Sequence, residues 1–235
     1  MKVSVCLAAY RGERYLEAQV RSILPQLCEG DELLISDDAP GGETERIACA
    51  LAQEDARIRL LRGPGEGVVR NFEFLLGEAA GEVIFLSDQD DVWLPGKREA
   101  VLREIGRGAV LVLHDAALTD AELHVTDRSF FACRQSTPGF WHNVMRNSFM
   151  GCCMAFRREV LECALPFPRG IPMHDQWIGL AAYRKGEVRF LPEALILHRQ
   201  HGENVTGGRT TLAQKLFWRV SLMCALPALL RHRGV

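Results

Sequence analysis

The sequence predicts an α/β domain in which a mostly parallel sheet is flanked by helices and followed by a helical C-terminal extension. The chain has 235 residues, of which 48% are hydrophobic and 25% charged, and this composition suits one compact domain with a short appendage. In the first half, short apolar runs alternate with amphipathic helical segments, as in repeated β-α-β units. Polar residues follow three of the four apolar runs, where open α/β sheets bind their ligands.

The first half contains four expected strands and three expected helices. The strands are expected at Lys2–Ala8, Glu32–Ser36, Ile58–Leu61 and Val83–Ser87, and the helices at Glu13–Leu24, Glu43–Gln53 and Val68–Leu76. Pro25 stands at the end of the first helix, where a proline interrupts helical hydrogen bonding. Strands joined by crossover helices lie parallel, so we expect helices on both faces of the sheet.

The second half is less regular. Strands are expected at Val110–His114, Met150–Phe156, Val188–Leu191 and Leu195–His198, and helices at Asp175–Tyr183 and Leu212–Leu230. In the last helix only Val220–Leu230 is uncharged, which is too short to span a bilayer because that takes roughly 20 apolar residues. This helix could lie on a membrane surface or pack on its own domain. We therefore divide the chain into a domain at residues 1–208 and a helical extension at residues 209–235.

Composition argues against several classes of function. The net charge is −2, so no broad basic surface for nucleic acid is expected. The eight cysteines form no C-x-x-C pair, which argues against a structural zinc site and suits a reduced, cytosolic protein. Met1 leads directly into a strand-like run, so no signal peptide is expected.

The strongest local signal is the acidic run Asp88-Gln89-Asp90-Asp91, which directly follows the apolar run VIFLS. Three carboxylates on one turn repel one another unless a cation neutralises them. Oxygen ligands suit Mg²⁺ and Mn²⁺, and such a metal could bind a diphosphate and stabilise it as a leaving group. The alternative is a solvated acidic turn, which the apolar strand before the run disfavours.

The sequence resembles family 2 of the GT-A glycosyltransferases, which have a Rossmann-like fold. The matching segments lie between about Lys2 and Gly208 and are VCLAAYRGERYLEAQVRSIL, LLISDD, GVVRNFEFLL, FLSDQDDVWLPGK, MHDQW and HRQHGENVTGG. The combination of DQDDVW, MHDQW and RQHGxN is similar to the bacterial rhamnosyltransferase-like branch. The resemblance implies an inverting, metal-dependent transfer of a sugar from a nucleotide-diphosphate donor, such as dTDP-rhamnose or a UDP-sugar.

The resemblance also implies roles for individual residues at the strand ends. The implied nucleotide-binding residues are Ala9, Tyr10, Arg11, Asp37, Asp38, Arg70 and Asp88, and the implied metal ligand is Asp90 with Asp88 beside it. Asp37 could accept a hydrogen bond from the imide N–H of uracil or thymine. Arg70 could equally be a surface arginine of its helix. Arg11 stands where the family often has Asn, and an Ala-Pro-Gly-Gly turn at 39–42 replaces the more usual Gly-Ser-Thr-Asp type, which leaves the donor sugar open.

Asp175 matches the general base of the family. An inverting transfer needs one carboxylate that takes the proton of the acceptor hydroxyl as its oxygen attacks the anomeric carbon. The diphosphate leaves on the opposite side, so no protein nucleophile is required. The alternative is that Asp175 N-caps a helix beginning at Gln176, but the other motifs favour the catalytic role.

Histidine, tryptophan and small residues supply the remaining candidates. His198 and His201 flank Arg199-Gln200, and either could add a nitrogen ligand or contact the diphosphate; His201 is the metal-ligand candidate. The candidates for the acceptor and sugar pocket are Trp93, Gly151, Cys152, His174 and Trp177. Tryptophan faces do stack on sugars, although core packing is their commoner fate.

Two other functions fit the sequence less well. A sugar nucleotidyltransferase would need a glycine-rich loop after the first strand, and residues 8–12 (AAYRG) are not one. A catalytically silent nucleotide-sugar-binding module would be expected to lack Asp88, Asp90 or Asp175. The sequence therefore predicts a cytoplasmic glycosyltransferase that uses Mg²⁺ or Mn²⁺. We expect a saccharide or lipid-linked saccharide acceptor in cell-surface polysaccharide synthesis, no nucleic-acid partner, and peripheral contact with the inner face of the membrane.

Overall fold

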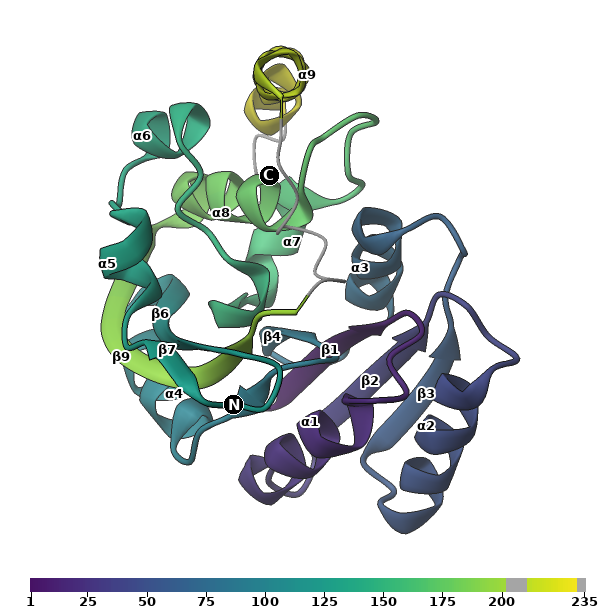
Figure 1. Ribbon diagram of the computed structural model, residues 1–235. Coiled ribbons are helices and arrows are strands. Elements are labelled where there is room, and N and C mark those ends of the chain that lie inside the picture. The colour runs from purple at the N-terminus through teal and green to yellow at the C-terminus, as the bar shows by residue number, and fades with distance from the viewer. Residues whose placement is uncertain (202–210, 232–235) are drawn as a thin grey trace.

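The computed structural model describes residues 1–201 and 211–231, and its elements form layers about one sheet (Figure 1). One face of the sheet is covered by α1 (Leu16–Ile23), α2 (Glu43–Glu54) and α4 (Lys97–Gly106), and the other by α3 (Val68–Glu78), α7 (Leu161–Ala164) and α8 (His174–Lys185). The last helix, α9 (Leu212–Arg231), lies outside the second of these layers. The α/β fold class predicted from the sequence is confirmed.

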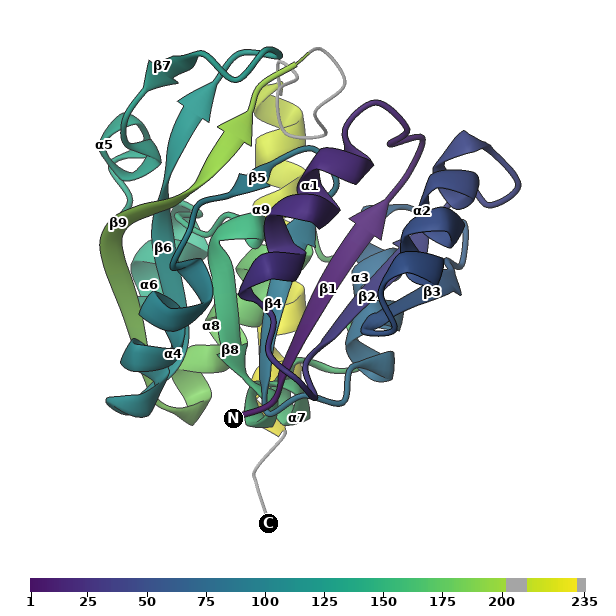
Figure 2. The ribbon, with the colours of Figure 1, turned by 90° about the horizontal axis from the view of Figure 1, so that it is seen from below.

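The first half of the sheet is parallel. Its strands are β1 (Val3–Ala9), β2 (Glu32–Asp37), β3 (Ile58–Arg62) and β4 (Val83–Asp88), in the spatial order β3-β2-β1-β4 (Figure 2). The side chains of β1, β2 and β4 are buried on both faces, as expected for strands between two helical layers, whereas the edge strand β3 is partly exposed. The register pairs Ala9 with Asp37 and Ala8 with Asp88, so the carboxyl ends of three strands meet at one edge of the sheet.

The second half of the sheet is mixed, with antiparallel pairs beside one long parallel pair. Its strands are β5 (Val92–Trp93), β6 (Ala109–Thr119), β7 (Val125–Asp127), β8 (Met154–Arg157) and β9 (Glu187–Arg199). Strand β8 runs antiparallel to both β4 and β6, whereas β9 runs parallel to β6. β8 therefore joins a parallel block to a second block that sequence periodicity alone did not connect to it.

Strand β9 is one strand, not the two short strands that the sequence suggested. The pairing with β6 shifts between His114–Leu191 and Asp115–Ala194, which leaves Pro192 and Glu193 unpaired in a bulge. A proline cannot donate to the strand ladder, and a bulge is one of the few places in a sheet that accept it. The proline that appeared to separate two strands therefore bends a single one.

Other boundaries differ for local reasons. Helix α1 begins at Leu16 rather than Glu13, because Gly12–Tyr15 forms a turn in which the N–H of Tyr15 donates to the carbonyl of Gly12. The expected strand at 150–156 begins as a 3-10 turn, Gly151–Cys153. Sequence reasoning did not predict β5, β7, α4, α7, α5 (Phe130–Arg134) or α6 (Phe140–Met145). These short elements lie in the irregular half.

Helix α9 matches its predicted bounds and packs on the domain through Leu222, Ala225 and Leu229, which are buried. The predicted domain boundary after residue 208 lies outside the described residues, as do residues 202–208 of the last family-like motif. Within the described part of the chain, no helix has the length and apolar character needed to cross a membrane.

Candidate active site

Three carboxylates gather where β4 ends, and we call Asp88, Asp90 and Asp91 the strand-end cluster. Asp88 is the last residue of β4, and the other two follow in the turn that leads to β5. Burial and the charges of Asp91 and Asp90 raise the pKa of Asp88 to about 8. Burial and the charge of Asp91 likewise raise the pKa of Asp90. The fold therefore holds together like charges that oppose one another's ionisation.

Asp91 has a structural position in the cluster. Its Oδ1 accepts hydrogen bonds from His198 Nδ1 at 2.9 Å and from the backbone N–H of Arg199 at 3.2 Å, which ties the end of β9 to the turn after β4. Burial alone would lower the pKa of His198, but the Asp91 carboxylate raises it to about 9. Sequence reasoning did not single out this pair, because its members are 107 positions apart in the chain.

Asp90 pairs with His201, the predicted nitrogen ligand. His201 Nε2 lies 2.7 Å from Asp90 Oδ2, and each side chain keeps 12% of its surface exposed. Arg199 Nε donates to the backbone carbonyl of Asp90 at 2.9 Å, which fixes the turn after β4 against the end of β9. The predicted metal-binding residues Asp90 and His201 are thus brought together from positions far apart in the chain, with Asp88 in electrostatic contact with Asp90.

These residues fit a hard divalent cation. Two carboxylates and an imidazole are ligands that Mn²⁺ and Mg²⁺ accept, and a cation would relieve the repulsion that raises the pKa of Asp88. A second group, Asp91, Cys152 and His198, has ligand atoms within 4.8 Å of one another. Hydrogen bonding to Cys153 and burial raise the pKa of the Cys152 thiol, so it is not a ready thiolate ligand. The Asp91 side chain is completely buried, whereas the side chains of Asp90 and His201 both keep an exposed fraction, and we therefore favour the Asp90–His201 side.

Asp37 and Asp38 are adjacent but differ in their surroundings. Asp38 accepts hydrogen bonds from the N–H groups of Gly65 at 2.7 Å and Gly67 at 2.8 Å, so it holds the loop before α3. The carboxylate of Asp37 accepts the N–H of Ala39 through Oδ1 at 3.0 Å, and its buried Oδ2 has no hydrogen-bond partner among the described residues. Burial raises the pKa of Asp37. Of the two predicted nucleotide-binding carboxylates, Asp37 has the spare acceptor and Asp38 has a structural partner.

The loop after β1 is fixed by Gln89 of the acidic run. The side-chain amide of Gln89 accepts from Tyr10 N at 2.8 Å and donates to the Tyr10 carbonyl at 3.0 Å. Arg11 has a positive φ of 48°, and its guanidinium lies 5.2 Å from the centre of the exposed Tyr10 ring. Ala9 pairs with Asp37 in the sheet. The predicted nucleotide-binding residues at the ends of β1 and β2 are therefore neighbours, and Gln89 connects them to the strand-end cluster.

Arg70 lies on the first turns of α3, and its guanidinium is already engaged. It contacts Glu73 and donates to the carbonyl of Phe167 at 3.2 Å. These contacts join α3 to the segment before α8. The guanidinium of Arg70 is partly buried by these contacts, and the nucleotide contact implied for Arg70 stays a prediction.

Asp175 lies in the first turn of α8 and is buried. The helix begins at His174, and its N-cap residue Met173 makes no side-chain capping bond, so Asp175 is inside the helix rather than at its cap. Its carboxylate accepts the N–H of Gln176 at 2.5 Å. Burial raises the pKa of Asp175 to about 6, although hydrogen bonds oppose the shift. Its charge also contributes, as the smallest cause, to the raised pKa of Asp88, so the predicted base lies near the strand-end cluster.

The turn at Gly151 packs directly against the start of α8. A β-carbon at this glycine would lie 3.0 Å from His174 Nε2, which is a tight contact, and 3.8 Å from Asp175 Cβ, which is an ordinary one, so a side chain here would press on the His174 ring. The His174 ring stacks on Phe72 with centroids 4.0 Å apart, and burial lowers its pKa to about 3. Neither nitrogen of this neutral ring has a hydrogen-bond partner within the described residues. His174 thus keeps two polar atoms beside Asp175.

The predicted tryptophans occupy the interior. Trp177 is 1% exposed and donates its Nε1–H to the Ala164 carbonyl at 2.8 Å, so its ring faces the core. Trp93 is 3% exposed and packs against Phe85. Beneath it lies Lys97, which sequence reasoning missed. Lys97 ends the family-like segment FLSDQDDVWLPGK, but the sequence gives no sign that its side chain is fully buried, which only the structure shows.

Lys97 connects Trp93 to the predicted pocket residue Cys152. Its Nζ lies 4.1 Å from the centre of the Trp93 ring and donates to the Cys152 carbonyl at 2.8 Å. Burial lowers the pKa of Lys97 to about 8, against the opposing effect of neighbouring thiols and of the strand-end cluster. The lysine therefore joins the turn at 151–153 to the floor of the site.

Comparison with known proteins identifies the family. The model of the family described as glycosyl transferase family 2 matches residues 4–165, more than half of the chain. The chain belongs to glycosyl transferase family 2. An uncharacterised glycosyltransferase from Nostoc is 27% identical over 214 residues, which cover 87% of this chain and 66% of that relative.

One further relative and one solved structure are also similar to this chain. A UDP-Glc:alpha-D-GlcNAc-diphosphoundecaprenol beta-1,3-glucosyltransferase from Escherichia coli is 32% identical over 98 residues, or 41% of this chain and 38% of that protein. The crystal structure of Staphylococcus aureus TarS 1-349 in complex with UDP-GlcNAc has the same fold, with a TM-score of 0.69 at 16% identity. It aligns with 90% of this chain and 62% of its own. The chain thus spans just under two thirds of the Nostoc relative and of the TarS fragment.

Proposed function

We propose that this family 2 protein is an inverting, metal-dependent glycosyltransferase that moves a sugar from a nucleotide-diphosphate donor to an acceptor hydroxyl. The observation that carries the proposal is the arrangement of two kinds of carboxyl group about one site. The strand-end cluster suits a cation and a diphosphate, whereas Asp175 is a single buried carboxyl on a separate helix. Such a division matches the two tasks of an inverting transfer, which are to hold the leaving group and to accept a proton.

In this proposal Asp175 is the general base. Its carboxylate takes the proton of the acceptor hydroxyl while the hydroxyl oxygen forms the new bond to the anomeric carbon and the bond to the diphosphate breaks. A pKa of about 6 leaves Asp175 ionised at neutral pH yet more basic than an ordinary aspartate. His174, which is neutral and has spare polar atoms, borders the same space.

Asp90 and His201, with Asp88 beside them, would hold Mg²⁺ or Mn²⁺. The bound cation would supply charge stabilisation to the departing diphosphate. Asp37 would accept the imide N–H of a pyrimidine base through its unpaired Oδ2, and Ala9 and Tyr10 would support the nucleotide. Asp38 would act by shaping the loop at 63–67.

The donor and acceptor are proposed at the level of chemical class. The motifs similar to the rhamnosyltransferase-like branch favour dTDP-rhamnose, and the names of the E. coli and S. aureus proteins favour UDP-sugars. Both donors present the same pyrimidine imide to Asp37. A lipid-linked saccharide is the proposed acceptor, because the E. coli relative is named for a diphosphoundecaprenol substrate. The enzyme would then work at the cytoplasmic face of the membrane, with residues 1–208 as the catalytic domain.

Calorimetric titration tests the donor site. The protein should bind UDP or dTDP in preference to GDP and ADP, and the affinity should depend on Mn²⁺. Asp37→Ala should reduce the preference for pyrimidines, whereas Val125→Ser, on the distant strand β7, is a surface control. Absence of binding to every nucleotide, with and without Mn²⁺, would contradict the proposal. If the protein binds a nucleotide and transfers its sugar, proton NMR of the product decides between inversion and retention at the anomeric carbon.

A further inference from the structure

The outer surface of α6 and α9 carries most of the exposed large apolar side chains. Among the described residues, eight large hydrophobic side chains are exposed, and five of them belong to these two helices: Trp141, Met145, Phe217, Val220 and Met223. We call these five residues the α6–α9 surface. Trp141 is 70% exposed and Phe217 is 66% exposed, so the cluster is not the edge of the core. Contiguous exposed apolar groups of this kind mark a surface that contacts something else.

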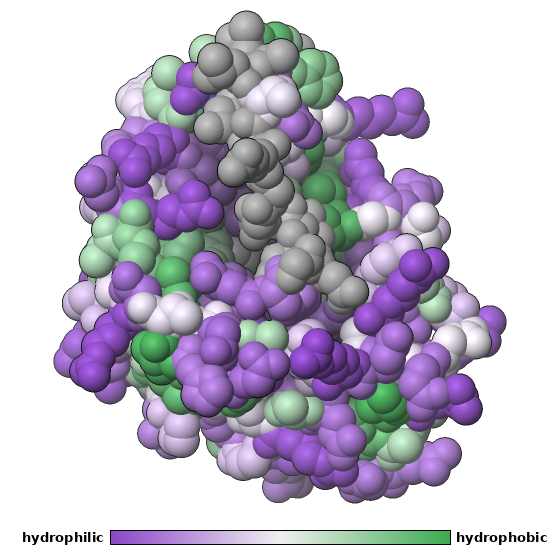
Figure 3. Space-filling view, viewed as in Figure 1, coloured by the Kyte–Doolittle hydropathy of each residue, from purple (hydrophilic) through white to green (hydrophobic). Residues whose placement is uncertain are grey.

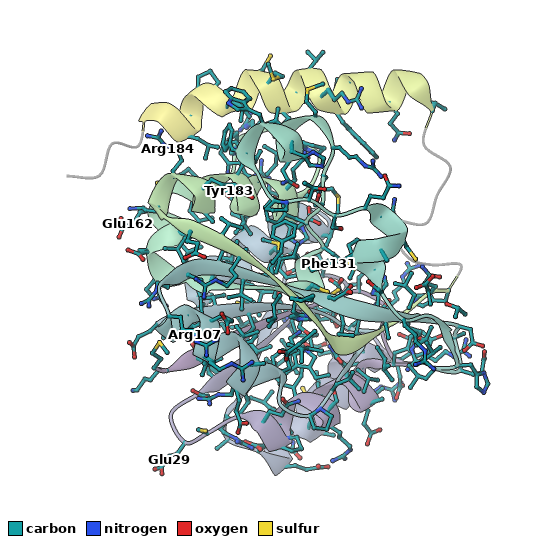
Figure 4. All side chains as sticks on the ribbon, turned by 90° about the vertical axis from the view of Figure 1, so that its left-hand side faces the viewer. Glu29, Arg107, Phe131, Glu162, Tyr183 and Arg184 are labelled. Atoms are coloured by element: carbon teal, nitrogen blue, oxygen red, sulfur yellow. The ribbon has the colours of Figure 1, made fainter. Side chains whose placement is uncertain are left out.

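Helix α9 is apolar on two faces. Leu222, Ala225 and Leu229 face the domain, whereas Phe217, Val220 and Met223 face solvent. Figure 4 shows α9 as the outermost element, with side chains directed away from the domain. Figure 3 has the view of Figure 1, and hydrophobic (green) residues lie at its top, where α9 is drawn in Figure 1. A helix that is apolar around its circumference normally has both faces covered.

The two helices form one continuous surface. Helix α6 packs against α9, and a groove between them is lined by Val144 and Met145 of α6 and by Val220, Met223 and Cys224 of α9. The exposed Arg219 borders this groove. An apolar groove with a cationic edge suits an occupant that combines hydrocarbon with negative charge.

Positive charge is concentrated at the C-terminal end of the sequence, which includes α9. Residues 204–235 contain five Lys or Arg and no Asp or Glu, although the whole chain carries a net charge of −2. Exposed aromatic and aliphatic groups beside basic residues are typical of helices that lie in the interface of a bilayer. A second copy of the chain docked on this surface would bring the Arg219 side chains of the two copies together, so self-association is the less favourable alternative.

We propose that the α6–α9 surface docks on an anionic lipid bilayer, with Trp141, Phe217, Val220 and Met223 inserted at the level of the headgroups and Arg219 beside the lipid phosphates. The groove and the exposed residues carry this assignment, and the charge distribution selects lipid as the partner. The proposal specifies which surface contacts the membrane. It rests on the proposed function only for the identity of the acceptor.

The docking surface is joined to the catalytic helix. Gln176, the neighbour of Asp175 in α8, donates its side-chain amide to the carbonyl of Asn143 in α6 at 2.7 Å. The same Asn143 side chain donates to the carbonyls of Thr137 and Gly139, which fixes the start of α6. Docking through α6 and α9 therefore sets the orientation of Asp175 relative to the bilayer, which would present it to the saccharide of a membrane-anchored acceptor.

Vesicle flotation tests the proposal. The whole protein should float with vesicles of equal parts phosphatidylglycerol and phosphatidylcholine and much less with pure phosphatidylcholine, and added salt should weaken the binding. The double variant Phe217→Ser with Val220→Ser should weaken vesicle binding about a hundredfold, because two side chains lose their burial in lipid. Arg219→Gln should weaken it about fivefold.

Matched controls separate docking from folding and catalysis. Val125→Ser removes an exposed apolar side chain from β7, far from α9 in Figure 1, and should leave vesicle binding unchanged. Circular dichroism and UDP binding should be the same in all variants. If the natural protein binds UDP but does not float with anionic vesicles, the proposal is wrong.

Two further outcomes are decisive. Equal flotation of Phe217→Ser/Val220→Ser and the natural protein would assign lipid binding to another surface. A dimer in sedimentation velocity that the same double variant dissociates, without any vesicle binding, would make the surface a contact between copies. Lipid docking without sugar transfer would overturn the proposed function while leaving this inference intact, and transfer to a soluble acceptor without docking would do the reverse.

Discussion

The strand-end cluster and Asp175 are both acidic and buried, but they differ in what surrounds them. Burial raises both pKa values, to about 8 for Asp88 and to about 6 for Asp175. Neighbouring carboxylates add to the effect at Asp88, whereas hydrogen bonds from Gln176 and others reduce it at Asp175. The crowded group is therefore suited to binding a cation and the solitary one to accepting a proton. The difference comes from neighbours contributed by separate elements and not from residue type.

Removing the solitary carboxyl should have the largest effect. Asp175→Asn keeps the shape of the side chain but cannot take a proton, so kcat should fall about a thousandfold. Donor affinity, measured by titration with UDP in Mn²⁺, should change little. Near-normal transfer by this variant would remove Asp175 from the base position and erase the distinction between the two regions.

Changing the crowded region should reduce transfer through the donor instead. Asp90→Asn removes a charged ligand beside His201, and we expect kcat/KM to fall roughly a hundredfold together with loss of the Mn²⁺ dependence of nucleotide binding. Asp120→Asn, at an exposed carboxylate on the loop before β7, is the control. Unchanged metal dependence in Asp90→Asn would move the metal to other residues, and Asp91, Cys152 and His198 would be the next group to test.

The pH dependence should follow the solitary carboxyl. A general base works when it is deprotonated, and burial places the pKa of Asp175 at about 6, so kcat should rise with pH through that value. At pH 5 the rate should be about tenfold lower than its plateau value, which rate measurements between pH 5 and 8 can detect. The residual rate of Asp175→Asn should lack this inflection. An inflection near pH 4 in the natural protein would contradict the burial argument.

The smallest expected effect separates Asp37 from Asp38. Asp37→Ala should weaken UDP binding about fivefold through loss of one hydrogen bond, with little change in stability. Asp38→Ala leaves the N–H groups of Gly65 and Gly67 without acceptors, so the free energy of unfolding should fall by about 1–3 kcal/mol. Chemical denaturation and calorimetry measure the two quantities. Equal effects of both substitutions on both quantities would refute this division of roles.

Much of the first half could be predicted from sequence. The four parallel strands and three helices have strong periodicity, and each strand begins and ends within two residues of its expected position. Local pattern suffices there because each element buries a regular apolar face or run. The acidic run and Asp37 could be singled out for the same reason, since they follow strands directly.

The second half resisted such prediction because its elements are short or bent. The sequence predicts two short strands at Val188–Leu191 and Leu195–His198, and only the pairing with β6 shows that they are one strand, β9, with a bulge at Pro192. The 3-10 turn at Gly151–Cys153 lies against His174 and Asp175 of α8, a contact that no local pattern reveals. Trp177 carried no signal that distinguishes a core tryptophan from one that stacks on sugar.

The sequence by itself determined the fold class, the family and the chemical types at the site, because apolar periodicity and carboxylates after strands are local properties. Only the tertiary structure decided which of those groups meet. It pairs Asp91 with His198, directs Asp38 to a loop, and buries Lys97 beneath Trp93. The physical reason is that burial, charge repulsion and hydrogen-bond partners depend on distances in space between residues far apart in the chain, and these distances set the pKa values on which the proposed chemistry depends.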